Sequence, residues 1–131
     1  MSHDQYSDRP SVAPAAACRR LVRRAKIITL NDQLRTTFKG GRVQMTRDFF
    51  ELDARLRGRA LSVMSRYNKF DDDSEHDSGV FIFAGYSFEW NIEYRGQDGS
   101  GISVDPADPA ITFRVLTLHA ASDLLIRPSN S

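Results

Sequence analysis

The sequence has one cysteine, Cys18, and no long apolar run. A lone cysteine cannot form a disulfide within the chain, which suits a reducing compartment. The longest purely apolar runs, such as residues 80–84, are far shorter than the roughly twenty residues that span a bilayer. Residues 1–14 lack a basic stretch followed by an apolar one, so we expect no secretory signal. We therefore expect a cytoplasmic protein that does not enter a membrane.

Several motifs that carry chemistry are also missing. The chain has no phosphate-binding glycine loop, no serine-nucleophile elbow and no paired-cysteine zinc pattern. The acidic residues 71–77 do not form a calcium loop, because glycine and glutamate are absent from the sixth and twelfth positions. Cys18 lies on an apolar stripe without a histidine partner, so we interpret it as a packing residue. No cofactor is expected.

Positive and negative charges are distributed unevenly along the chain. Residues 1–47 hold ten Lys or Arg against three Asp or Glu, whereas residues 48–131 hold eight against fourteen. The net charge of +1 therefore hides a split of +7 and −6. Such a split can mean that the basic half binds nucleic acid. It can equally mean that the two halves attract each other within one fold, and we favour this interpretation.

The N-terminal part of the chain predicts a tail, a helix and a short strand. Residues 1–14 are polar, hold two prolines and are expected to be disordered. From Ala15 apolar residues recur at three- and four-residue steps, which predicts a helix that the glycines at 40–41 end. Alternation over residues 42–46 then predicts a short strand.

A second helix is predicted from Asp48. Glu51, three residues later, completes a typical helix start because both side chains can bind free backbone amides. Apolar positions keep helical spacing for five turns. These positions are Phe49, Leu52, Leu56, Ala60, Val63 and Tyr67.

The remaining chain predicts three strands. Residues 80–84 are apolar on both faces, residues 85–86 suit a hairpin turn, and residues 87–94 alternate strictly between polar and apolar. The alternation predicts Phe88, Trp90, Ile92 and Tyr94 inward, and Ser87, Glu89, Asn91 and Glu93 outward. Residues 111–119 predict a further strand, with a helix from Pro106 as the alternative.

Together these elements predict an α+β fold, in the order α-β-α-β-β-β. The two main helices are expected to pack on one face of a small, mainly antiparallel sheet. We expect a single domain over residues 15–123, followed by a C-terminal tail at residues 124–131.

Two histidines are the candidates for catalysis. His76 lies between Glu75 and Asp77, and a neighbouring carboxylate can orient a histidine as a general acid or base. His119 lies near the end of the last predicted strand and would reach the same sheet edge in one antiparallel arrangement. Such a set would suit phosphodiester cleavage or a divalent metal. The alternative, which we favour, is that His76 only fixes its loop and His119 only ends a strand, so no metal site is assigned.

The first predicted helix carries a cluster of basic residues. Its members are Arg19, Arg20, Arg23, Arg24 and Lys26. They suit phosphate groups or an acidic partner, with binding that weakens as salt rises. No aromatic residues are interleaved for base stacking, so they also fit the solvated face of an amphipathic helix.

Three blocks resemble a known family. LNDQLRTTFKGGRVQMT, EHDSGVFIFAGYSFEWNIEY and DPADPAITFRVLTLHAASD, within residues 28–123, resemble the conserved blocks of the domain of unknown function 3768 family. The resemblance implies a small bacterial protein, often encoded on mobile elements, with no known catalytic residues to carry across. The long basic N-terminal extension and His119 depart from the family pattern.

The order of elements is also similar to that of toxin ribonucleases of the RelE/ParE superfamily. That similarity would assign functional roles to Tyr94, Arg114 and His119, although the acidic second half does not suit RNA. The sequence alone therefore predicts a non-catalytic interaction or regulatory module with a protein partner, and the family resemblance implies a link to plasmid or phage biology. The alternatives are a phosphodiester-cleaving enzyme and a nucleic-acid binder that uses the basic helix.

Overall fold

The computed structural model describes residues 12–98 and 101–121. Residues 1–11 and 122–131 lie outside the described residues, and with them most of the expected N-terminal tail and all of the C-terminal one. The described helices are α2 (Val12–Thr37), α3 (Arg47–Phe50) and α4 (Ala54–Ser65). The strands are β1 (Gly41–Met45), β2 (Ser78–Phe83), β3 (Tyr86–Gly96) and β4 (Thr112–Ala121).

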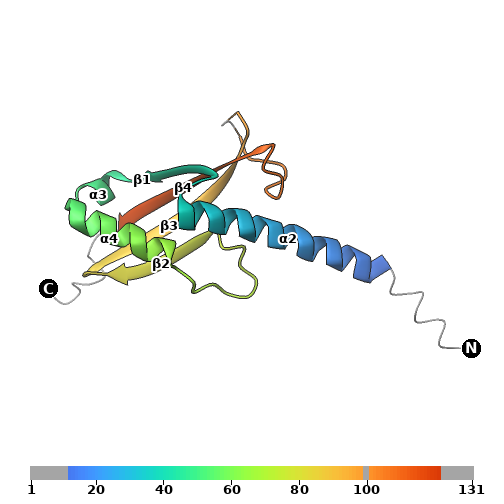
Figure 1. Ribbon diagram of the computed structural model, residues 1–131, viewed down its shortest axis with the longest axis horizontal. Helices are drawn as coiled ribbons and strands as arrows, with labels where there is room; N and C mark the ends of the chain where they lie inside the picture. The colour runs from blue at the N-terminus through green and yellow to red at the C-terminus, as the bar shows by residue number, and fades with distance from the viewer. Residues whose placement is uncertain (1–11, 99–100, 122–131) are drawn as a thin grey trace, which may run out of the picture.

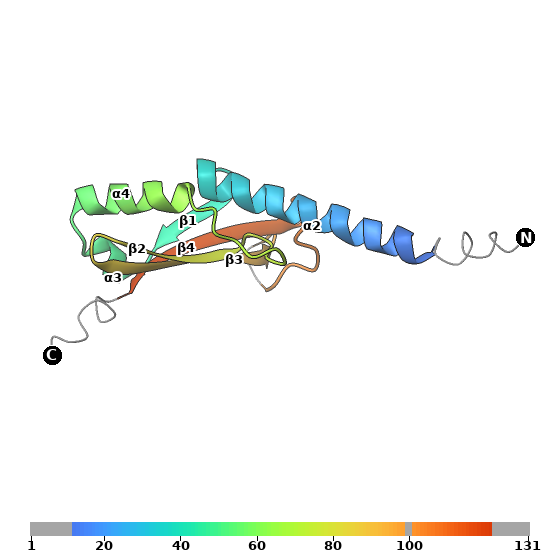
Figure 2. The ribbon, with the colours of Figure 1, turned by 90° about the horizontal axis from the view of Figure 1, so that it is seen from below.

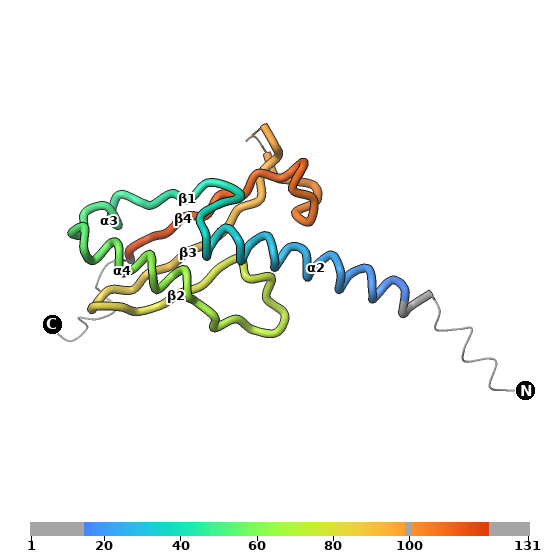
Figure 3. Tube along the Cα trace, viewed as in Figure 1, coloured from blue at the N-terminus to red at the C-terminus, as the bar shows by residue number. Residues whose placement is uncertain are grey.

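The helices and strands form two layers. Figures 1 and 2 show α2 and α4 on the same face of the four-stranded sheet, and the predicted α+β architecture is confirmed. The N-terminal half of α2 projects past the end of the sheet, as the trace in Figure 3 makes clear. No helix among the described residues is both long and apolar enough to span a membrane.

The predicted first helix is confirmed as α2, which starts three residues before Ala15. Its end differs from the prediction. Phe38, not a glycine, takes the left-handed conformation (φ 63°), and its N–H donates to the carbonyl of Leu34 at 2.8 Å. Gly41 instead starts β1, where a Cβ would collide with the backbone of Arg114 on the neighbouring strand.

The expected continuous helix from Asp48 to Tyr67 is wrong, because the chain forms two helices with a break between them. The break lies before Asp53, whose extended backbone (φ −68°, ψ 158°) and side chain start α4 anew. Its carboxylate accepts a hydrogen bond from the N–H of Leu56 at 2.9 Å. Arg57 donates to the carbonyl groups of Phe50, the last residue of α3, and of Leu52, and so satisfies them.

The sheet has the strand order β1-β4-β3-β2. β4 pairs antiparallel with β3, and β3 pairs antiparallel with β2. β1 runs parallel to β4, so the sheet is mixed. The strand predicted over residues 111–119 is confirmed, and the alternative helix from Pro106 is not formed. The hairpin between β2 and β3 turns at Ala84 and Gly85, both with positive φ, one residue earlier than predicted.

The core lies between the sheet and the helices. Phe88, Trp90 and Ile92 face the helices and are buried, as the alternation predicts, together with residues of α2, α3, α4 and β4. Those partners are Leu34, Phe49, Ala60, Met64, Leu116 and Leu118. Ser87 points to the opposite face of the sheet, as predicted, but it is buried there.

Candidate functional site

The loop that carries His76 is fixed against α2. The Nδ1 atom of His76 lies 2.9 Å from Oδ1 of Asp32, and its ring stacks on Phe70 with centroids 3.8 Å apart and planes at 9°. The backbone of His76 has a positive φ of 62°, a conformation that a bulky residue adopts only where its surroundings hold it. Asp32 also accepts a hydrogen bond from Arg35 at 2.9 Å. The true acidic partner of His76 is therefore on α2, not Glu75 or Asp77 beside it.

A buried hydrogen-bond network lies next to this contact. Asn31 is fully buried, and its Nδ2 donates to the hydroxyl of Tyr94 (2.8 Å) and to the carbonyl of Glu75 (3.0 Å). Its Oδ1 accepts from Nε of Arg114 at 2.7 Å. Arg114 in turn donates to the carbonyl of Pro106. We call the five side chains of Asn31, Asp32, His76, Tyr94 and Arg114 the latch.

The interior position of the latch changes the titration of two of its groups. Burial raises the pKa of Tyr94 to about 12; the nearby carboxylates of Asp77 and Glu75 also raise it, whereas the hydrogen bond from Asn31 opposes the rise. Burial lowers the pKa of Arg114 from its usual value. Both effects follow from low solvation beneath α2, and the guanidinium of Arg114 lies 5.1 Å from the centre of the Tyr94 ring.

The latch joins distant parts of the chain. It connects α2 with the loop before β2, with β3, with β4 and with the turn at residue 106. Each of these hydrogen bonds joins one part of the chain to another, and His76 has one ring nitrogen and one ring face engaged. This arrangement suits a structural fastening better than a reaction centre, because its polar groups serve each other rather than an open cavity.

The structure does not bring the two candidate histidines together. His119 pairs with Glu89 across the sheet, on the face turned away from α2 and α4, whereas His76 stacks on Phe70 in the helix layer. Tyr94 and Arg114 do meet, as the ribonuclease similarity requires, but beneath α2 and without His119. Within residues 12–98 and 101–121, no group of three or more His, Cys, Asp or Glu side chains is placed to hold a metal ion.

The basic residues of α2 divide into two sets. Arg24 donates to the carbonyl groups of Ser74 (2.7 Å) and Asp72, and so helps to hold the loop before β2. Arg23 forms an ion pair with Asp105 at 3.1 Å. Arg19, Arg20 and Lys26 are exposed on the same helix. Two of the five candidate binding residues therefore have intramolecular contacts that join the basic half of the chain to its acidic half.

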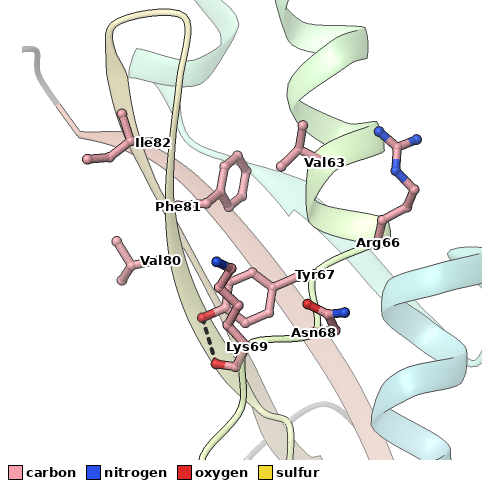
Figure 4. A pocket seen from close by; sticks show the side chains of 8 residues that line it. All are labelled: Val63, Arg66, Tyr67, Asn68, Lys69, Val80, Phe81 and Ile82. Atoms are coloured by element: carbon pink, nitrogen blue, oxygen red, sulfur yellow. Dashed lines mark hydrogen bonds between the residues drawn. The ribbon is translucent and has the colours of Figure 1, made fainter.

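A second feature, which the sequence does not reveal, is a groove along β2. A cavity of about 630 Å³ lies between the end of α4 and β2, and Val63, Tyr67 and Phe81 line it (Figure 4). A cavity of about 380 Å³ shares Tyr67, Lys69 and Val80 with it and continues past Ser78.

A third cavity, of about 270 Å³, lies at the other end of β2, between the start of α4 and residues 83–84. The three cavities follow β2 over its whole length, because each is lined by residues of β2 or of its flanks. We call this row of cavities the edge groove. The apolar residues at 80–84 predict a strand covered on both sides or near a packed edge, but Val80 and Ile82 are exposed, so one side of β2 is uncovered.

The fold thus defines a small α+β protein with an internally fastened loop and an apolar groove beside one edge strand. Residues 45–123 match the model of the family described as protein of unknown function DUF3768, so the chain belongs to that family. The match begins at Met45. It therefore includes only the last two residues of the first of the three blocks, which spans residues 30–46. Searches of curated proteins and of solved structures found no significant match.

Proposed function

We propose that this protein is a non-catalytic module that binds a partner protein by adding one of the partner's extended segments to β2. The observation that carries the proposal is that β2 is an edge strand, paired on one side only among the described strands, with the edge groove beside it. Strand addition of this kind uses main-chain hydrogen bonds for affinity and side-chain pockets for specificity.

The hydrogen-bond pattern of the hairpin indicates which groups of β2 face outward. The N–H of Ile92 donates to the carbonyl of Asp77 at 2.8 Å, so the odd-numbered residues of β2 bond to β3. In an antiparallel ladder the alternate residues then point their N–H and C=O groups away from that partner. Ser78, Val80 and Ile82 therefore present their backbone groups at the edge of the sheet.

The sequence of β2 lacks the usual protection of an edge strand. Edge strands commonly carry charged residues or proline, which discourage pairing with another chain. β2 reads SGVFIF, with neither, and the side chains of Val80 and Ile82 are 56% and 65% exposed. An uncharged, apolar and exposed edge is a template for a further strand.

The proposed role also agrees with the arrangement of the histidines. A phosphodiester-cleaving enzyme would need His76 and His119 near one phosphate, and they lie in different layers of the fold. The family resemblance extends the proposal to a bacterial protein that acts in plasmid or phage biology, and the single cysteine extends it to a cytoplasmic one. Neither extension affects the argument from β2.

Site-specific photo-cross-linking in the host cells tests the proposal. A photoreactive phenylalanine analogue at position Ile82 is expected to give a discrete protein adduct, and the same analogue at Gln44, on the opposite edge strand, is expected not to. Val80→Pro should abolish the adduct, because it removes an outward N–H while leaving the ladder with β3 intact. The melting temperature of the Val80→Pro variant shows whether its fold is retained. Equal adducts from both positions, or an adduct that persists in Val80→Pro, would contradict the proposal.

A second candidate function concerns the projecting half of α2. Between Val12 and Leu30 this helix has five basic and no acidic side chains, and Figure 2 shows it extending beyond the sheet. Such a surface suits the phosphates of nucleic acid. A gel-shift assay with duplex DNA at two salt concentrations tests this. Binding that survives replacement of Arg19 and Arg20 by alanine, or that does not weaken as salt rises, would refute the assignment.

A further inference from the structure

We propose that the segment received by the edge groove is acidic, with two carboxylates flanking an apolar residue on the side that faces α4. The inference rests on the proposed function, because it specifies the chemistry of the same partner segment. It follows from the charges on the α4 side of the groove, from the apolar floor between them and from their spacing.

The α4 side of the groove carries a row of cations. Arg66 and Lys69 line the main cavity, and Arg55 and Arg59 line the cavity at the start of α4. The carboxylate of Asp53, which also lines that end cavity, accepts the hydrogen bond that caps α4. The groove beside residues 80–84 is therefore positive and attracts carboxylates.

The opposite end of the groove has a different charge. There the cavity is lined by Asp71 and Asp77, with Lys69 as its basic residue. Carboxylates of a bound segment are therefore expected beside Val80 and the residues that follow it, not beside Ser78. This difference in charge between the two ends favours one orientation of a bound acidic segment along β2.

The floor between the cations is apolar. Figure 4 shows Phe81 and Val63 pointing toward one another between β2 and α4, whereas Val80 and Ile82 point away from the helix. A strand added to β2 alternates its side chains between these two sides. One side chain therefore meets the floor formed by Phe81 and Val63, and its neighbours in sequence lie beside Val80 and Ile82.

The spacing of the helix matches the spacing of a strand. Arg59 and Val63 lie in α4 and Arg66 directly follows it, and at 1.5 Å per residue the two arginines are separated by about 10 Å along the helix axis. Residues two apart in a strand are separated by about 7 Å, so three same-side residues cover about 13 Å. Arg66 donates to Ser62 and turns away from β2 in Figure 4, so binding of the segment requires this long side chain to rotate toward the groove, where its reach covers the difference. The preferred pattern is therefore acidic-x-apolar-x-acidic, with apolar or β-branched residues at x.

The same charges disfavour a second copy of this chain as the occupant. In an antiparallel pairing of β2 with β2, both copies of α4 would lie on the same face of a continuous sheet. Arg59 and Arg66 of one copy would then approach the same residues of the other, and like charges in close contact oppose association. An acidic segment from a partner neutralises this row instead.

Two synthetic peptides test the inference. The fluorescein-labelled peptide TEVVVET places two glutamates and one valine on the same side of a strand, and TKVVVKT replaces the glutamates by lysines. We expect the glutamate peptide to bind at least about tenfold more tightly in fluorescence anisotropy, with the difference shrinking as salt rises. We also expect amide shifts at Val80 and Ile82 in its NMR titration.

Charge reversal sharpens the test. Arg59→Glu with Arg66→Glu should reverse the preference in favour of the lysine peptide by about tenfold. The matched control, Arg19→Glu with Arg20→Glu, changes the net charge equally but lies on α2 and should leave the preference unchanged. Analytical ultracentrifugation of the free protein is expected to show a monomer.

The outcomes separate the two proposals. Equal affinity of the two peptides, with cross-linking from Ile82 still abolished by Val80→Pro, overturns the acidic pattern and leaves strand addition standing. Loss of site-specific cross-linking overturns both. No binding of the glutamate peptide up to about 1 mM, or a dimer formed through β2, also overturns the inference.

Discussion

Replacement of Asn31 by alanine is expected to be among the most damaging single changes to this fold. Asn31 is fully buried on α2, and its side chain makes three hydrogen bonds, to Tyr94, to the carbonyl of Glu75 and from Arg114. Alanine fits the helix well but offers no polar atom. The partners of Asn31 would lose these three hydrogen bonds.

The cost follows from the groups left behind. A buried polar group without a partner costs about 1–3 kcal/mol, and a charged group such as the guanidinium of Arg114 costs more. Arg114 is 2% exposed and keeps only its contact with the carbonyl of Pro106, so its contribution dominates. Tyr94 and Glu75 lie closer to solvent and can recover part of their loss. We therefore expect Asn31→Ala to lower the free energy of unfolding by about 3–5 kcal/mol, a large part of the 5–15 kcal/mol typical of a domain.

Urea denaturation followed by circular dichroism measures this effect. Thr36→Ala is the matched control, because Thr36 is exposed on the same helix and bonds only to a carbonyl of its own helix. Its free energy of unfolding should change by no more than about 0.5 kcal/mol. Asn31→Asp should lose less than Asn31→Ala, because its carboxylate still accepts from Arg114. A loss below about 1 kcal/mol in Asn31→Ala would show that the latch does not hold these segments together.

Three further predictions follow from single sites. A Cβ at Gly79 would lie 2.6 Å from Nε1 of Trp90, so Gly79→Ala should destabilise the fold by about 1–3 kcal/mol in the same urea titration. Gly58 has open space around it, so Gly58→Ala should instead stabilise α4 by about 0.5–1 kcal/mol. The folded-state pKa of Tyr94 is raised from 10.0 to about 12, so as pH rises the unfolded chain loses its Tyr94 hydroxyl proton before the folded protein does. The stability that the protonated Tyr94 contributes is therefore complete below pH 10 and should be lost as pH rises to about 12. The difference in tyrosinate absorbance between wild type and Tyr94→Phe after rapid pH jumps should then have its midpoint near pH 12, and a midpoint near 10 would contradict the assignment. Asp53→Ala should cost about 1 kcal/mol in thermal unfolding, because it removes the cap of α4, while Asp53→Asn should cost much less.

The parts of the fold that sequence predicts well are those with a strong local period. The alternation around Trp90 places Phe88 and Ile92 correctly, because a strand with one covered face leaves that pattern in any fold. The strand that contains Arg114 is also predicted, through its β-branched residues. Arg114 itself is not predicted as a buried residue, because its partner Asn31 lies 83 positions earlier in the chain.

The helix break before Asp53 escaped prediction for a different reason. The apolar spacing continues from Phe49 across the break to Ala60, since both α3 and α4 turn an apolar face toward the same core. Periodicity reports which face is buried and not whether the backbone is continuous. The sequence predicts one helix start, at Asp48, whereas α3 begins after Thr46 and Asp53 caps α4.

The charge split along the chain is explained in part by contacts within the fold. Arg23 of the basic half pairs with Asp105 of the acidic half, and Arg24 donates to two carbonyl groups of the acidic loop. These contacts support the interpretation that the halves attract each other. They do not use the cations of α4, which lie within the otherwise acidic second half and line the edge groove.

The latch and the edge groove are connected through the loop between α4 and β2. Tyr67 and Lys69, which line the main cavity, begin this loop, and His76 fixes its far end through Asp32 and through stacking on Phe70. His76→Ala removes both contacts and should release the loop without touching the groove itself. We therefore expect faster hydrogen exchange of the loop amides and a loss of affinity for the glutamate peptide of about two- to fivefold.

His119→Ala is the control for this prediction, because His119 lies on the far face of the sheet and contacts neither the loop nor the groove's lining. It should leave both loop exchange and peptide affinity unchanged. If His76→Ala weakens the peptide without changing exchange in the loop, the coupling does not run through loop order. If neither quantity changes, His76 does not support the groove, and its contact with Asp32 has only a local effect on its own backbone conformation.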